Sequence, residues 1–171
     1  MGATGLARSM SVLATLSVTA ADLVGRVMPP YPDGLDELGG SCVSLSRDPD
    51  PVCEYSVGVL ASPAADESGE PVPRFVVAGE LAGRDGPRAQ WRITDAVPYV
   101  GDLPGYYLQF GTCRVKGQDD ARVAAIVRQH DTATEWLKDV AWAGRLRLPD
   151  ARFEVLDART VDCINEAYYG L

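Results

Sequence analysis

Apolar and polar residues alternate in short runs along most of the chain, a pattern typical of β-strands with one buried face. The clearest alternation is that of Tyr55, Val57 and Val59. The run over 121–129 is almost wholly apolar at its middle, which predicts a central strand covered on both faces. The strands expected from these runs cover residues 41–46, 53–61, 74–83, 89–96, 106–115, 121–129, 145–148 and 152–156.

The connections between these runs are mostly short and rich in turn residues. Three pairs of neighbouring runs predict hairpins, the last of them across the turn at 149–151. No alternation of strands with long helices is visible, which argues against an α/β fold. We therefore predict an all-β fold of about eight mainly antiparallel strands, arranged as a meander sandwich or a barrel.

One segment, 132–141, predicts a short helix instead. Thr132 and Glu135 have the spacing of a capping box, in which each side chain bonds the backbone N–H of the other. The apolar residues after the box recur on one face of such a helix. They are Trp136, Leu137, Val140 and Ala141.

The N-terminal residues 1–20 fit two interpretations. Arg8, the apolar run over 10–18 and the small residues before Ala21 match a secretion signal cleaved near residue 20. Leucines in the same segment also recur at nearly helical spacing, so a retained segment would form an N-terminal helix. We favour the signal peptide over 1–20, followed by an extended lead-in over 21–40 and a single β-rich domain over 41–171.

The four cysteines bear on the compartment. No Cys-x-x-Cys pair occurs, which argues against a zinc site and against a thioredoxin-like redox motif. Two disulfides formed in an oxidising compartment fit better. Cys42 and Cys53 flank a hairpin loop, so we predict the pairs Cys42–Cys53 and, by elimination, Cys113–Cys163. Four buried free thiols are the alternative. The expected location is the periplasm or the exterior, or the cytoplasm if residues 1–20 belong to the fold.

Charge and composition exclude several classes of partner. The net charge is −8, so a broad basic face and a nucleic-acid partner are not expected. No apolar run reaches the ~18 residues that a membrane-spanning helix needs. Fourteen arginines against two lysines are typical of GC-rich coding and indicate a bacterial source. No metal site or cofactor motif is recognisable, so neither a metal nor a cofactor is expected.

The only histidine, His130, lies beside Asp131 and near Glu135. A histidine close to carboxylates can act as a general base, so these three residues are the candidates for catalysis. No nucleophile in a recognisable strand–turn–helix motif accompanies them. A capping box gives the same residues a purely structural role. In that interpretation His130 and Asp131 lie at the corner between a strand and the predicted helix.

Aromatic side chains provide the second set of candidates. Exposed Tyr and Trp at the rim of a loop make good contact residues, although one member of each alternating pair would fill the core. The candidate binding residues are Trp91, Tyr99, Tyr106, Tyr107, Tyr168 and Tyr169. We therefore predict a non-enzymatic binding or inhibitor module exported to the bacterial envelope, where a basic protein would be attracted to the acidic chain. The alternatives are a β-barrel that holds a small ligand and an enzyme that uses His130.

Overall fold

The computed structural model describes residues 17–44, 53–64, 69–100 and 104–170. These residues form mainly antiparallel strands in three sheets, so the all-β prediction is confirmed; no sheet closes into a barrel. Helical structure in the described residues is limited to α1 (Ala20–Leu23) and the 3-10 turns η1 (Ala158–Thr160) and η2 (Glu166–Tyr169). The expected signal peptide falls largely on residues 1–16, outside the described residues.

The first sheet has five strands in the order β1-β5-β4-β3-β2. Their bounds are β1 (Val27–Met28), β2 (Asp36–Val43), β3 (Tyr55–Ser62), β4 (Val72–Asp85) and β5 (Arg88–Pro98). The two hairpins expected here, β2 with β3 and β4 with β5, are both present. The expected lead-in over 21–40 therefore also contributes structure, since most of α1, all of β1 and the first half of β2 lie in it.

The second sheet has four strands in the order β12-β11-β9-β6. Their bounds are β6 (Tyr106–Phe110), β9 (Val123–Arg128), β11 (Val140–Arg147) and β12 (Arg152–Val155). Strand β9 is central and buried on both faces, as its apolar run predicts: Val123 and Val127 face one side and Ile126 the other. The hairpin of β11 and β12 is also confirmed.

The third sheet has short strands in the order β10-β13-β7-β8. Their bounds are β7 (Cys113–Val115), β8 (Gln118–Asp119), β10 (Trp136–Leu137) and β13 (Val161–Ile164). The expected single strand over 106–115 is divided into β6 and β7 at Gly111, whose φ of +84° favours glycine and turns the chain from the second sheet to the third.

The predicted helix over 132–141 is wrong: this segment contains β10 and the start of β11. The side chain of Asp131, not that of Thr132, accepts hydrogen bonds from the backbone N–H groups at the start of this segment. Its Oδ1 accepts from the N–H of Ala133 and of Thr134, both at 2.9 Å, and from the Thr134 hydroxyl. This turn directs the chain into β10, where Trp136 and Leu137 pair with β13.

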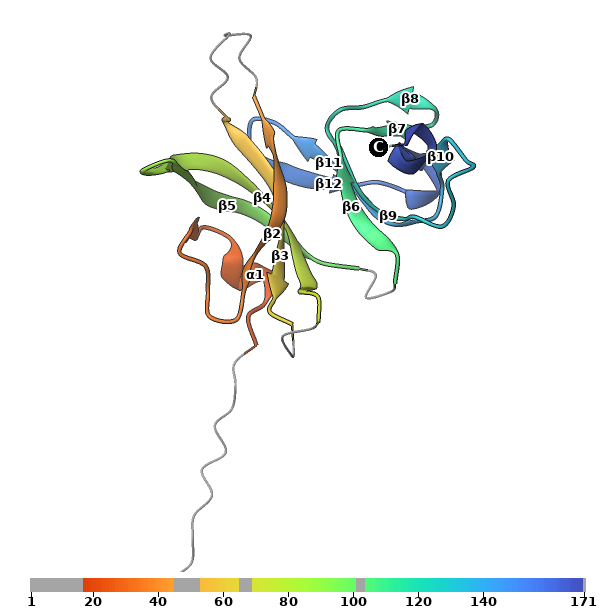
Figure 1. Ribbon diagram of the computed structural model, residues 1–171. Helices are drawn as coiled ribbons and strands as arrows, with labels where there is room; N and C mark the ends of the chain where they lie inside the picture. Colours follow the sequence, from red (N-terminus) through yellow and green to blue (C-terminus); the bar gives the residue numbers. More distant parts are fainter. Residues whose placement is uncertain (1–16, 45–52, 65–68, 101–103, 171) are drawn as a thin grey trace, which may run out of the picture.

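The three sheets and the lead-in are arranged as layers (Figure 1). Buried apolar side chains pack between these layers. Between the first and second sheets lie Val57, Val76, Ala78, Ala124, Ile126, Leu146 and Ala151. Between the second and third sheets lie Cys113, Val123, Ala125, Val127, Leu137, Ala143, Val161 and Cys163. On the outer face of the first sheet, Leu60, Phe75, Val77 and Ile93 are covered by Leu23 and Met28 of the lead-in.

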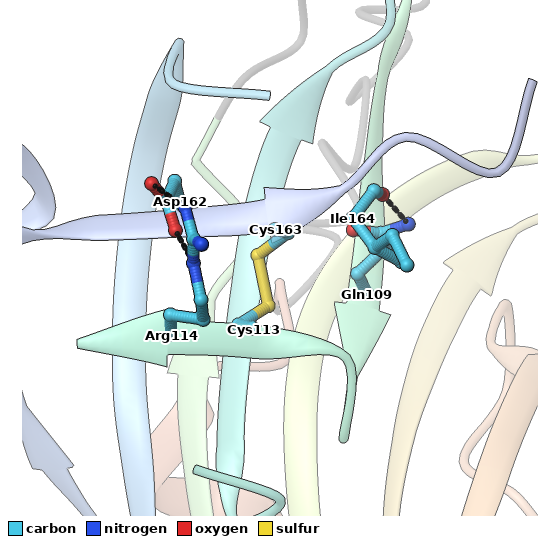
Figure 2. The surroundings of a disulfide bond; sticks show 6 residues. All are labelled: Gln109, Cys113, Arg114, Asp162, Cys163 and Ile164. Carbon is cyan, nitrogen blue, oxygen red and sulfur yellow. Dashed lines mark hydrogen bonds and ion pairs between the residues drawn. A yellow bond between two sulfur atoms is a disulfide. The ribbon is translucent and has the colours of Figure 1, made fainter. Parts of the chain in front are cut away.

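Both predicted disulfides are present, Cys42–Cys53 and Cys113–Cys163. Cys113 and Cys163 lie opposite each other in β7 and β13, with their Cα atoms 3.9 Å apart (Figure 2). The same two strands are joined by Arg114, whose Nε and Nη2 both donate to the Asp162 carboxylate at 2.7 Å. Two disulfides indicate an oxidising environment outside the cytoplasm.

Candidate functional site

The largest hollow between the sheets lies where β2 and β6 form the neighbouring edges of the first and second sheets. Its volume is about 690 Å³. We call it the tyrosine groove. Strands β2 and β3 line one side with Leu38, Gly39, Gly40, Ser41, Val57 and Val59. The start of β4, the loop after β5 and strand β6 line the rest with Glu70, Pro71, Pro73, Tyr99, Pro104, Gly105, Tyr106, Tyr107, Leu108 and Phe110.

Local backbone interactions fix the tyrosine side of the groove. Gly105 has a φ of +85°, and its carbonyl accepts a 2.9 Å hydrogen bond from the Gln129 N–H, which places the start of β6 beside β9. Tyr99 follows β5 directly, and its N–H donates to the Arg74 carbonyl at 2.8 Å. These residues therefore stand on paired backbone, so the groove wall is formed in advance of any ligand.

The tyrosine hydroxyls on this wall remain protonated at neutral pH. The Tyr106 hydroxyl donates to Asp139 Oδ1 at 2.8 Å, and this hydrogen bond raises the pKa of Tyr106. Burial raises the pKa of Tyr99 and of Tyr107. The Tyr107 hydroxyl lies 3.2 Å from Gln129 Oε1, to which it donates. The ring of Tyr107 packs in the core between the second and third sheets, whereas those of Tyr99, Tyr106 and Phe110 lie on the groove side. The wall thus offers flat aromatic rings, which are suited to protein contacts.

Strand β2 forms the exposed side of the groove. All its residues but the last are exposed, and Leu38 exposes 49% of its surface. No charged residue interrupts the stretch from Leu38 to Val43. As the last strand of its sheet, β2 has backbone N–H and C=O groups on its outer side without a strand partner among the described residues. Strand β6 is likewise the last strand of the second sheet.

The groove carries negative charge. Glu70 is the one charged side chain among its described lining residues. Asp36 and Glu37 precede Leu38 on β2 and add two carboxylates at the end of that wall. A net charge of −8 on the whole chain reinforces this potential.

Three of the six predicted aromatic residues line the groove, namely Tyr99, Tyr106 and Tyr107. The other three lie elsewhere. Trp91 is on β5 opposite Met28, against the outer core of the first sheet. Tyr168 and Tyr169 form an edge-to-face pair with ring centroids 5.2 Å apart in η2. The Tyr169 hydroxyl donates to Glu135 Oε1 at 2.5 Å, which places this pair beside the His130 loop.

The structure brings His130, Asp131 and Glu135 to one loop. His130 Nδ1 lies 2.8 Å from Asp131 Oδ2. Hydrogen bonds from the backbone and the hydroxyl of Thr134, and from the backbone of Ala133, lower the pKa of Asp131. This carboxylate therefore stays ionised and orders the turn.

A hollow of about 380 Å³ beside this loop is lined by Arg114, His130, Thr134, Glu135, Trp136 and Lys138. Thr134 has the one hydroxyl group among these described residues, and it donates to Asp131 Oδ1 at 2.8 Å. It is thus bonded to the carboxylate and not to His130. The contacts explain how the loop is held, and they show no nucleophile paired with a base.

The described ranges contain no cluster of three or more His, Cys, Asp or Glu side chains that could hold a metal ion. No helix within them combines the length and the apolar character that crossing a membrane requires.

Sequence reasoning missed the β2 and β6 aliphatic and glycine residues of the groove, such as Leu38, Gly39 and Leu108. The available signal is the run Leu38–Val43, which has no charged residue and overlaps the predicted lead-in over 21–40. Its position beside β6 depends on how two sheets stack, which no local pattern encodes.

Comparison of the chain with protein-family models, with curated proteins and with solved structures finds no significant match. Conclusions about function therefore rest on the geometry of the chain itself.

Proposed function

We propose that this protein is a non-enzymatic binding module of the bacterial envelope, and that the tyrosine groove binds an extended segment of a basic partner protein. The observation that carries the proposal is the convergence of the rings of Tyr99, Tyr106 and Phe110 on one groove bordered by two sheet edges. A periplasmic or secreted location is part of the proposal, and the two disulfides support it.

An extended peptide fits the shape of this groove. A sheet edge binds a peptide by adding it as a further strand, with main-chain hydrogen bonds for affinity and side-chain pockets for specificity. The eight residues of β2 and the five of β6 provide such edges, and the rings of Tyr106 and Phe110 lie in the hollow between them. Alternate side chains of an added strand would point toward these rings, since successive side chains in a strand point to opposite faces.

The charge of the groove favours a basic segment. Glu70 lies in the wall, and Asp36 and Glu37 lie at one end of it, so a lysine or arginine would meet carboxylates within the groove. The tyrosine rings also attract cations, an Arg guanidinium more often than a Lys ammonium. Part of the affinity should therefore fall as salt increases, because screening shortens the range of surface charges.

The test is a selection from a library of random short peptides displayed on phage, followed by titration calorimetry with the enriched peptide. We expect the enriched peptides to combine lysine or arginine with alternating apolar residues. Leu38→Arg places a positive charge on the groove and should weaken binding by about tenfold or more. The matched control is Val155→Arg, because Val155 is an apolar residue of the edge strand β12 that exposes 68% of its surface away from the groove lining.

Backbone pairing has its own test. Methylation of alternate backbone nitrogens in the enriched peptide removes donors needed by an added strand, whereas methylation of the other set leaves them in place. Methylation of one set of nitrogens should abolish binding, and methylation of the other set should be tolerated. Enrichment of acidic peptides, or equal loss of binding with Leu38→Arg and Val155→Arg, would refute the proposal.

A further inference from the structure

A second hollow lies on the opposite, outer face of the five-stranded sheet. Its volume is about 160 Å³. The segment from Met28 to Glu37 crosses over it, and Met28, Tyr31 and Glu37 line it from that side. We call it the strap cavity. Its other lining residues are Gly40, Ser41, Cys42, Ser56, Val57, Gly58, Val59, Leu60, Val77, Trp91 and Ile93.

Two paired glycines create the floor of the strap cavity. Gly40 of β2 lies opposite Gly58 of β3 in the sheet, so no side chain projects from either position. A Cβ atom on Gly40 would lie 3.1 Å from the Val57 carbonyl oxygen, and one on Gly58 would lie 3.2 Å from the Gly39 carbonyl oxygen. A larger residue at either position would therefore disturb the close packing of β2 against β3.

One part of the cavity wall is apolar and buried. Met28 exposes 1% of its surface, Leu60 2% and Ile93 4%, so all three are held in the core. Trp91 lies on the strand next to Met28 and packs against the same group. An engineered apolar cavity of about 150 Å³ binds benzene, which indicates the size of ligand that a hollow of this volume can hold.

The carboxylate of Glu37 lies at the edge of the strap cavity. Glu37 Oε2 accepts a 2.8 Å hydrogen bond from the Tyr31 hydroxyl. Glu37 Oε1 lies 3.2 Å from where a Cβ of Gly40 would be, so it lies over the glycine floor. Burial and this hydrogen bond raise the pKa of Tyr31, which keeps the hydroxyl as the donor. Oε1 is therefore the acceptor that remains for a ligand.

We propose that the strap cavity binds a small organic cation, an ammonium group on an apolar body the size of one aromatic ring. The apolar body would lie against the buried side chains of Met28, Leu60 and Ile93. The ammonium group would donate to Glu37 Oε1 and lie near the aromatic rings of Tyr31 and Trp91, which favour cations. The strap cavity shares Gly40, Ser41, Val57 and Val59 with the lining of the tyrosine groove, but Tyr31, Glu37 and Trp91 line the strap cavity alone. The proposal does not depend on the function proposed for the groove.

The probe is benzylamine, compared with its neutral analogue benzyl alcohol by NMR titration of the folded protein. We expect benzylamine to bind at least about tenfold more tightly, because a charge-assisted hydrogen bond is stronger than a neutral one. Glu37→Gln keeps an acceptor for Tyr31 and should remove this preference. Asp36→Asn removes the same charge one residue away, outside the cavity lining, and should retain it.

Occupancy of the cavity is tested with Ser56→Leu, which places a larger side chain at a lining position, and with Leu38→Arg, which alters a groove residue that does not line the strap cavity. Ser56→Leu should abolish benzylamine binding and Leu38→Arg should leave it unchanged. Absence of benzylamine binding to the natural sequence would overturn the proposal. Equal binding of the amine and the alcohol, or shifts confined to the groove, would overturn it as well.

Discussion

Removal of the two disulfides should destabilise the protein unequally. Cys113–Cys163 closes a loop with a sequence separation of 50, and Cys42–Cys53 one with a separation of 11. In the chain-entropy model the unfolded state loses freedom in proportion to the logarithm of loop length, which gives about 4 kcal/mol for the first bond and about 3 kcal/mol for the second.

Burial increases this difference. Cys113 exposes 2% of its surface and Cys163 none, within the core between the second and third sheets. Replacing both with alanine therefore also removes packed sulfur atoms, whereas Cys42 lies on the exposed edge strand β2. A loss of about 4 kcal/mol or more is a large part of the roughly 5–15 kcal/mol that stabilises a typical domain.

The assay is urea unfolding of the variants Cys113→Ala/Cys163→Ala and Cys42→Ala/Cys53→Ala beside the natural sequence. We expect the first variant to lose more free energy of unfolding. Thermal unfolding of the same variant should show a melting temperature lower by about 8–16 °C. A larger loss from the Cys42 variant would refute the reasoning from loop length and burial. A reduced natural protein as stable as the oxidised one would refute the structural role of both bonds.

Three further changes should affect stability. Ile126→Ala, at a fully buried position of β9, should cost about 2–5 kcal/mol in urea unfolding, whereas Val155→Ala at an exposed position should cost almost nothing. Asn165→Ala should cost about 3 kcal/mol by the same assay, since the buried amide donates to the carbonyls of Asp131 and Thr134 at 2.9 and 2.7 Å. The pKa of Asp131 is lower in the folded protein than in the unfolded chain, where it is about 4. The Asp131 carboxylate therefore stabilises the fold above the unfolded pKa, and this stabilisation is lost as the pH falls through the folded pKa. The free energy of unfolding, measured by urea titration at several pH values, should therefore fall less steeply in acid for Asp131→Asn. An unchanged acid profile would contradict that assignment.

The elements with strong local patterns were predictable from the sequence. The alternation through β3 and the apolar run of β9 encode which faces are buried, and these strands lie where the patterns place them. The hairpins follow from short turns, and the spacing of Cys42 and Cys53 across one loop indicated the first disulfide.

The failures arise where two local patterns compete or where layers meet. Thr132 and Glu135 have the spacing of a capping box. However, the N–H groups of the two residues that follow Thr132 donate to the Asp131 carboxylate, and this turn leads the chain into β10. The tyrosine groove needs β2 and β6, which are far apart in sequence and adjacent only because two sheets stack. Tyr106 could therefore be named as a candidate from the sequence, but its position beside Leu38 could not.

The most direct test of the proposed function locates the selected basic peptide on the protein by NMR. Backbone amide shifts should change along β2 and β6 and around Tyr99, and the change should weaken with added salt. Shifts centred on His130 and Glu135, with β2 and β6 unchanged, would contradict the account and point to the other loop as the functional site.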